Sequence, residues 1–123
     1  MNIKDKKKLI TKNLLLYGFL PMLLAIQYLE DRKQYRWCEV IIKTLHDFKE
    51  QLEIEIPDKH QEGVAQKMRI QFMSHYHLSG RLIFANTGHL TEKILQSIAE
   101  SSVVKQNERP LKITIFNNPN RKK

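Results

Sequence analysis

The run of residues 14–29 limits the possible folds more than any other part of the chain, because nearly every position in it is apolar. It is about as short as a membrane-spanning helix can be, and Gly18 and Pro21 interrupt it. We therefore expect no membrane span but two helices, one over 3–17 ended by Gly18 and one over 21–31 with Pro21 in its first turn. The second helix has almost no polar face, so neighbouring helices or a partner chain must cover it on several sides.

A third helix is predicted over 35–52, since its apolar residues recur every three or four positions, as one buried helix face requires. These residues are Cys38, Ile41, Ile42, Leu45, Phe48 and Leu52. The charged residues 30–34 are the natural turn before it. The second and third helices are therefore predicted to form a helical hairpin.

The segment 67–78 shows nearly clean alternation of apolar and polar residues, which is typical of a strand with one buried face. A rival helical interpretation uses Val64, Met68, Phe72 and Tyr76, which lie four residues apart. We favour the strand. Ser79 and Gly80 then form a hairpin turn into a second strand over 81–85. A helix over 90–101 and a final strand over 111–116 follow.

These elements predict an α+β fold: an N-terminal helical hairpin or bundle, then a small antiparallel sheet with one packed helix. The alternative is an all-α fold. The length of 123 residues suits a single domain. Its parts are a helical half over 1–56, a mixed α/β half over 57–117 and a basic tail over 118–123. The single cysteine, Cys38, forms no internal disulfide and falls on an apolar helix face, so we expect a cytoplasmic protein with a buried thiol.

Charge is the clearest indication of function, because the chain has a formal net charge of +8. Five lysines lie within residues 1–12, and residues 63–89 contain no carboxylate. In the strand interpretation Lys67, Arg69 and Arg81 share one face, which is able to follow a phosphate backbone. The predicted nucleic-acid-binding residues are Lys67, Arg69, Arg81, Lys6, Lys7 and Lys8.

His75 and His77 are the candidates for metal binding or acid–base chemistry. Two residues apart on a strand, both imidazoles would project from the same face. A catalytic metal needs at least a third ligand, for which His60, His89 or a carboxylate would serve. The simpler interpretation is a pair of solvated histidines beside basic side chains.

The four glycines are isolated, so no Gly-rich phosphate loop is present, and no cofactor is implied. The leading hypothesis is a non-enzymatic binding or assembly protein that engages nucleic acid, another polyanion or a nucleoprotein assembly. Accessory proteins of phages and mobile elements often share this profile, which is an analogy only. The alternatives are a small nuclease-like enzyme centred on His75 and His77, and a subunit that binds a protein partner or its own copy through the apolar helical half.

Overall fold

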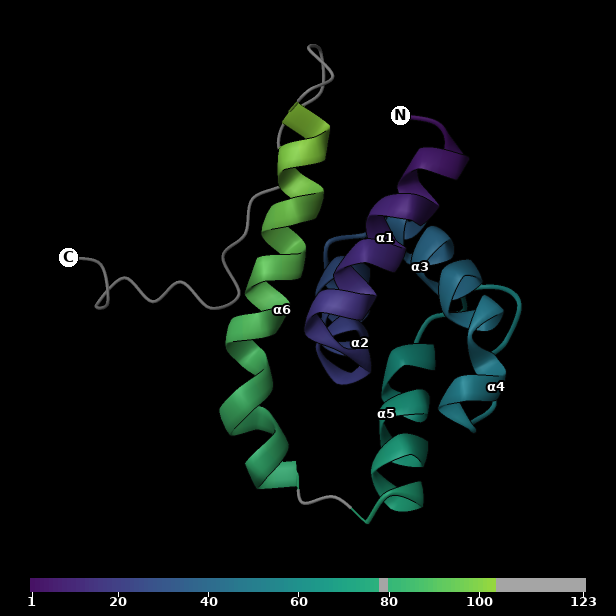
Figure 1. Ribbon diagram of the computed structural model, residues 1–123, viewed down its shortest axis with the longest axis vertical. Coiled ribbons are helices and arrows are strands. Elements are labelled where there is room, and N and C mark those ends of the chain that lie inside the picture. Colours follow the sequence, from purple (N-terminus) through teal and green to yellow (C-terminus); the bar gives the residue numbers. More distant parts are fainter. Residues whose placement is uncertain (78–79, 104–123) are drawn as a thin grey trace, which may run out of the picture.

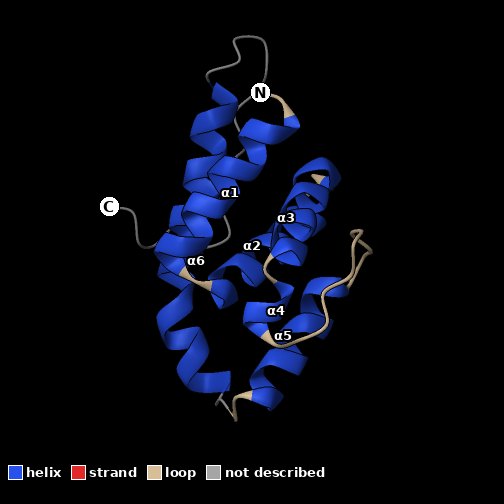
Figure 2. Ribbon diagram, turned by 45° about the vertical axis from the view of Figure 1, so that its right-hand side comes forward, coloured by secondary structure: helices blue, strands red, loops and turns tan. Residues whose placement is uncertain are grey.

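The computed structural model describes residues 1–77 and 80–103, with the backbone alone for 80–86 and 102–103. Six helices make up this part of the chain, and it contains no strand (Figures 1 and 2). They are α1 (Ile3–Tyr17), α2 (Phe19–Asp31), α3 (Tyr35–Asp47), α4 (Lys49–Leu52), α5 (Val64–His75) and α6 (Gly80–Val103). The predicted α+β fold is therefore wrong, and the all-α alternative fits the structure.

Gly18 separates α1 from α2, as the sequence predicts. Its φ of 99° is one that residues with a side chain rarely adopt, and its N–H donates to Leu14 O at the end of α1. The next helix begins at Phe19, two residues earlier than predicted. Pro21 still lies in its first turn, where a missing N–H leaves no helical hydrogen bond unmade.

The centre of the core is α2, which packs against α1, α3, α5 and α6. In Figure 1 it lies among these helices, with α6 on one side and α3 and α5 on the other. Six of its side chains are fully buried: Met22, Leu23, Ala25, Ile26, Tyr28 and Leu29. Helices of the same chain therefore cover the apolar surface of α2. None of the described helices has the length and apolar character needed to cross a bilayer.

The predicted hairpin of the second and third helices is confirmed by α2 and α3, which pack together across a short turn. The third helix ends earlier than expected, at Asp47. A break at Phe48 separates it from the single turn α4. The apolar pattern continues across this break, which is why the sequence shows one helix of 35–52.

The predicted strand over 67–78 is instead helix α5 as far as His75. Val64 and Met68 are buried, and the Phe72 ring lies 4.8 Å from that of Phe19. Ile70, which a strand would have buried beside Met68, is 58% exposed. The four-residue spacing of the rival interpretation therefore describes the buried face, and the period-two alternation is coincidental.

The second predicted strand, over 81–85, lies within α6, whose helical backbone begins at Gly80. The expected helix over 90–101 is its later part, with Ile94, Leu95 and Ile98 fully buried. The proposed turn at Ser79 and Gly80 falls partly outside the described residues. The strand over 111–116 and the tail over 118–123 lie wholly outside them.

Candidate functional site

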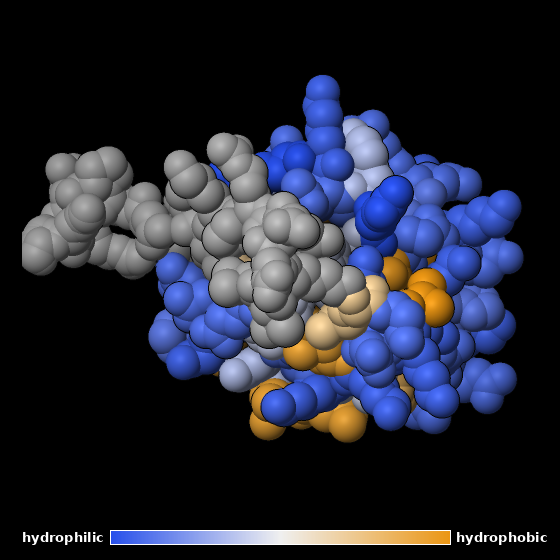
Figure 3. Space-filling model, turned by 90° about the horizontal axis from the view of Figure 1, so that it is seen from above, coloured by the Kyte–Doolittle hydropathy of each residue, from blue (hydrophilic) through white to orange (hydrophobic). Residues whose placement is uncertain are grey.

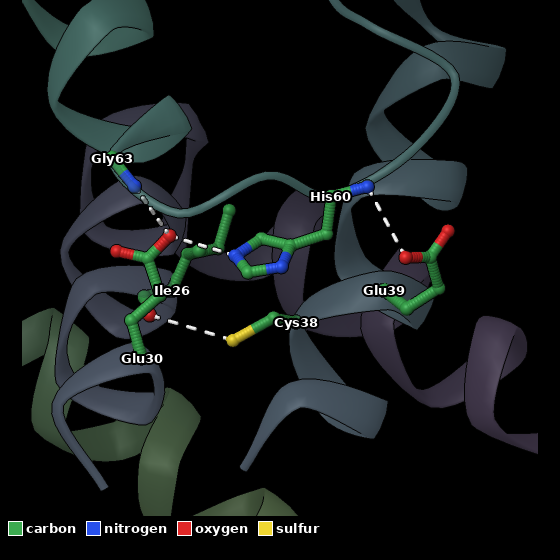
Figure 4. A network of polar contacts seen from close by, with 6 residues as sticks. All are labelled: Ile26, Glu30, Cys38, Glu39, His60 and Gly63. Atoms are coloured by element: carbon green, nitrogen blue, oxygen red, sulfur yellow. Dashed lines mark hydrogen bonds and ion pairs between the residues drawn. The ribbon is translucent and has the colours of Figure 1, made fainter. Parts of the chain in front are cut away.

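A buried pair of ionisable side chains, Glu30 and His60, is the most polar feature of the interior. His60 Nε2 lies 2.7 Å from Glu30 Oε2, and each side chain is only 7% exposed. The same carboxylate oxygen accepts the backbone N–H of Gly63 at 3.2 Å (Figure 4). Since an unpaired buried carboxylate is costly, these two donors are what allow Glu30 to lie there.

Three elements supply this network. Glu30 lies in the last turn of α2, and Glu39 of α3 accepts the backbone N–H of His60 at 3.2 Å. His60 itself belongs to the segment 53–63, which has no regular secondary structure (Figure 2). The side chains of α2 and α3 thus anchor this segment to the helical hairpin, just before α5 begins.

Cys38 lies close to the pair in Figure 4, and a thiol, an imidazole and a carboxylate are the groups of a nucleophilic triad. The thiol has other surroundings, however. It is fully buried and donates to Ile26 O at 3.7 Å. Burial, reinforced by the charge of Glu30, raises the pKa of Cys38 from 9.0 to about 12. A thiol held neutral in this way is no nucleophile, so the network acts as a structural anchor.

His75 and His77 do not have the geometry on which the metal prediction was based. His75 is the last residue of α5, and its Nε2 lies 3.3 Å from Glu53 Oε1. His77 follows the helix with φ of 55°. Among the described residues, no group of three or more His, Cys, Asp or Glu side chains could hold a metal ion. A metal site at His75 and His77 stays a prediction. The common strand face on which it was based is absent, because His75 ends α5 and His77 follows the helix.

Helix α5 also separates two of the predicted nucleic-acid-binding residues. Lys67 is exposed, whereas Arg69 turns toward α2 and donates from Nη1 to Gln27 Oε1 at 2.6 Å. Two positions apart on a helix, they lie on opposite sides. The Arg81 side chain lies outside the described residues. Lys67 and Arg69 therefore do not share the basic face that the strand interpretation predicted for them.

The three consecutive lysines of α1 have different surroundings. Lys6 Nζ lies 5.0 Å above the Trp37 ring, and Lys7 Nζ forms an ion pair with Asp47 at 2.9 Å. Both therefore face α3. Lys8 is exposed on the other side of the helix.

Lys4, Lys8 and Lys12 form what we call the α1 lysine face. They lie four residues apart, all three are exposed, and none pairs with a carboxylate within the described part of the chain. Leu15 and Leu16 continue this outward surface and are 74% and 61% exposed. Figure 3 views the molecule from the end where α1 begins, and the described surface there is largely hydrophilic with small apolar patches.

Sequence reasoning missed Glu30 and Glu39 as hydrogen-bond partners of His60. Glu30 stands first in a charged stretch, which is typical of a solvated turn, and no short-range pattern links it to a residue 30 positions away. The α1 lysine face, in contrast, was detectable, since a four-residue spacing within a predicted helix implies one surface. Comparison with family models, curated proteins and solved structures found no match.

Proposed function

We propose that this chain is a non-enzymatic cytoplasmic protein that binds nucleic acid through the α1 lysine face. The observation that carries the proposal is the alignment of Lys4, Lys8 and Lys12 on the exposed side of α1. Lys6 and Lys7 make internal contacts and serve the fold instead. Such a surface requires only negative charge of its ligand, so the expected recognition is of the phosphate backbone and not of base sequence.

The spacing of the three lysines supports a linear polyanion. Residues four apart on a helix are separated by about 6 Å along its axis, so the three ammonium groups extend over about 12 Å. Asp5 is exposed near them and reduces the local charge, but the surface keeps a positive excess. Lysines of this kind bind phosphate by charge, with release of counterions.

The sequence adds positive charge beyond the described residues. Residues 104–123 contain Lys105, Arg109, Lys112, Arg121, Lys122 and Lys123 against one acid, Glu108. This segment raises the general attraction to a polyanion, whatever its placement. The α1 lysine face is the part of the proposal that can be tested residue by residue.

The test measures binding of a fluorescein-labelled 20-nucleotide single-stranded RNA by anisotropy at several salt concentrations. We expect the double variant Lys8→Glu/Lys12→Glu to bind about tenfold or more weakly, with a salt dependence reduced by about two counterions. The matched control is Lys59→Glu/Lys93→Glu, which makes the same change in net charge at two exposed lysines elsewhere. Equal weakening in both double variants, or no binding by the parent chain, would contradict the proposal.

A protein-binding role is the second candidate, and the exposure of Leu15 and Leu16 favours it. Adjacent leucines on a surface rarely remain so accessible without a use, although single exposed apolar residues are ordinary. Sedimentation velocity of the parent chain and of Leu15→Ser/Leu16→Ser separates the candidates. Self-association that the double variant abolishes, together with no RNA binding, would favour the protein-binding role.

A further inference from the structure

A groove of about 550 Å³ lies between α5 and the segment 53–63, away from the α1 lysine face. Its volume falls within the range of about 300–1,000 Å³ that is usual for small-molecule sites. The apolar side chains that line it come from both walls: Ile54, Ile56 and Pro57 from the segment, and Val64 and Met68 from α5. In Figure 2 the segment appears as the loop that leads into α5.

The wall formed by the segment 53–63 is fixed at several points although it has no regular secondary structure. Near its start, the backbone N–H of Glu55 donates to Gln71 Oε1 of α5 at 2.6 Å. Near its end, His60 is bound by Glu30 and Glu39. A groove whose walls are held in this way is largely formed before any ligand arrives, which reduces the entropy lost on binding.

Two lysines give the groove its electrostatic character. Lys49 of α4 and Lys67 of α5 both line it, and both residues are exposed. Glu55 is the one carboxylate among the lining residues, so the positive charges outnumber it. His46 Nε2 lies 3.4 Å from Lys49 Nζ, and within the described part of the chain no carboxylate forms an ion pair with Lys49.

We propose that this groove binds a small amphipathic anion, with an apolar chain along the buried side chains and an acidic group between Lys49 and Lys67. The chemistry is that of a medium-chain carboxylate. The apolar walls remove the chain from water, and the two ammonium groups select the charged head. This site is independent of the proposed function, because it shares no residue with the α1 lysine face.

The test uses decanoate, added below its micelle concentration to uniformly ¹⁵N-labelled protein and followed by amide chemical shifts. We expect saturable binding of one decanoate, with shifts concentrated in residues 54–71. Lys49→Glu/Lys67→Glu should weaken binding about tenfold or more, since reversal of two charges removes the attraction to the head group. Both positions are exposed, so the fold should tolerate the change.

Two controls decide the result. Lys8→Glu/Lys12→Glu makes the same net change in charge outside the groove and should bind decanoate as the parent does. Decanol offers the same chain without the acid and should bind more weakly than decanoate. Equal binding of decanol and decanoate, shifts spread over the whole molecule, or no saturation would overturn the proposal, whether or not the chain binds RNA.

Discussion

Glu30 and His60 show how two residues can decide the course of a loop. Each would be unfavourable at its buried position alone, and together they satisfy one another and tie the segment 53–63 to α2. A buried pair of this kind stabilises less than its contacts suggest, because both groups lose their hydration. Its main effect is to specify the position of the loop, because His60 meets its hydrogen-bond partners Glu30 and Glu39 there.

This coupling can be measured. His60→Ala should lower the free energy of unfolding by about 3 kcal/mol, because it leaves the Glu30 carboxylate buried with only the Gly63 N–H. Adding Glu30→Gln to His60→Ala should recover part of that loss, since it removes the buried charge. Urea denaturation of the two single variants and the double variant forms the cycle. Additive losses would mean that the two side chains do not interact.

Cys38 carries the second prediction at the scale of single residues. Its pKa of about 12 in the folded chain lies above the ordinary 9.0, so the folded state favours the neutral thiol. The resulting stability is fully present below pH 9 and is lost as the pH rises toward 12. At pH 10.5 the loss should be about 2 kcal/mol.

Comparison with Cys38→Ala isolates this effect from lysines and tyrosines that titrate in the same range. The parent should lose about 2 kcal/mol more stability than Cys38→Ala between pH 8 and pH 10.5, as measured by urea denaturation. Identical losses in the two proteins would show that the thiol ionises as readily in the folded state as in the unfolded one.

At the scale of elements, α5 explains why a sequence pattern can mislead. Residues 67–75 of this helix alternate with a period of two, but the helix buries Val64 and Met68 and leaves Ile70 in solvent. The apolar contact for Phe72 comes from Phe19 of α2, more than 50 positions earlier in the sequence. Local alternation carries no information about such a distant partner.

Met68 and Ile70 test the helix directly, because a strand would place both on the same buried face. Met68→Ala should cost about 2–5 kcal/mol through loss of buried contacts. Ile70→Ala should change stability by less than about 0.5 kcal/mol, as exposed positions usually do. Thermal or urea denaturation of the two variants measures the difference. Similar, large losses in both would contradict the burial of only one face of α5.

The N-terminal elements were predictable for the opposite reason. Gly18 and Pro21 are strong local signals, and the apolar stripe of α3 has a helical period that no strand shares. The bounds of α1 agree with the sequence at both ends. Of the candidate site, the spacing of Lys8 and Lys12 was visible in the sequence, but the contacts of Lys6 with Trp37 and of Lys7 with Asp47 required the packing of α1 on α3.

At the scale of the whole molecule, charge and core are separated along α1. One side carries Ile10 and Leu14 into the core, and the other presents Lys8 and Lys12 to solvent. The groove beside α5 lies on other elements, so the two proposed sites can be altered independently. This separation makes the charge-reversal variants interpretable, since none of them removes a buried contact.

The central position of α2 also has a consequence for the order of events during synthesis. Thr91 Oγ1 of α6 lies 3.1 Å from Pro21 O, so partners 70 residues apart in sequence meet in the core. A ribosome must therefore release most of the chain before α6 can cover the apolar surface of α2. During that interval Met22 and Ile26 lack part of their final cover, and a nascent chain in this state is the form most exposed to chaperones and to aggregation.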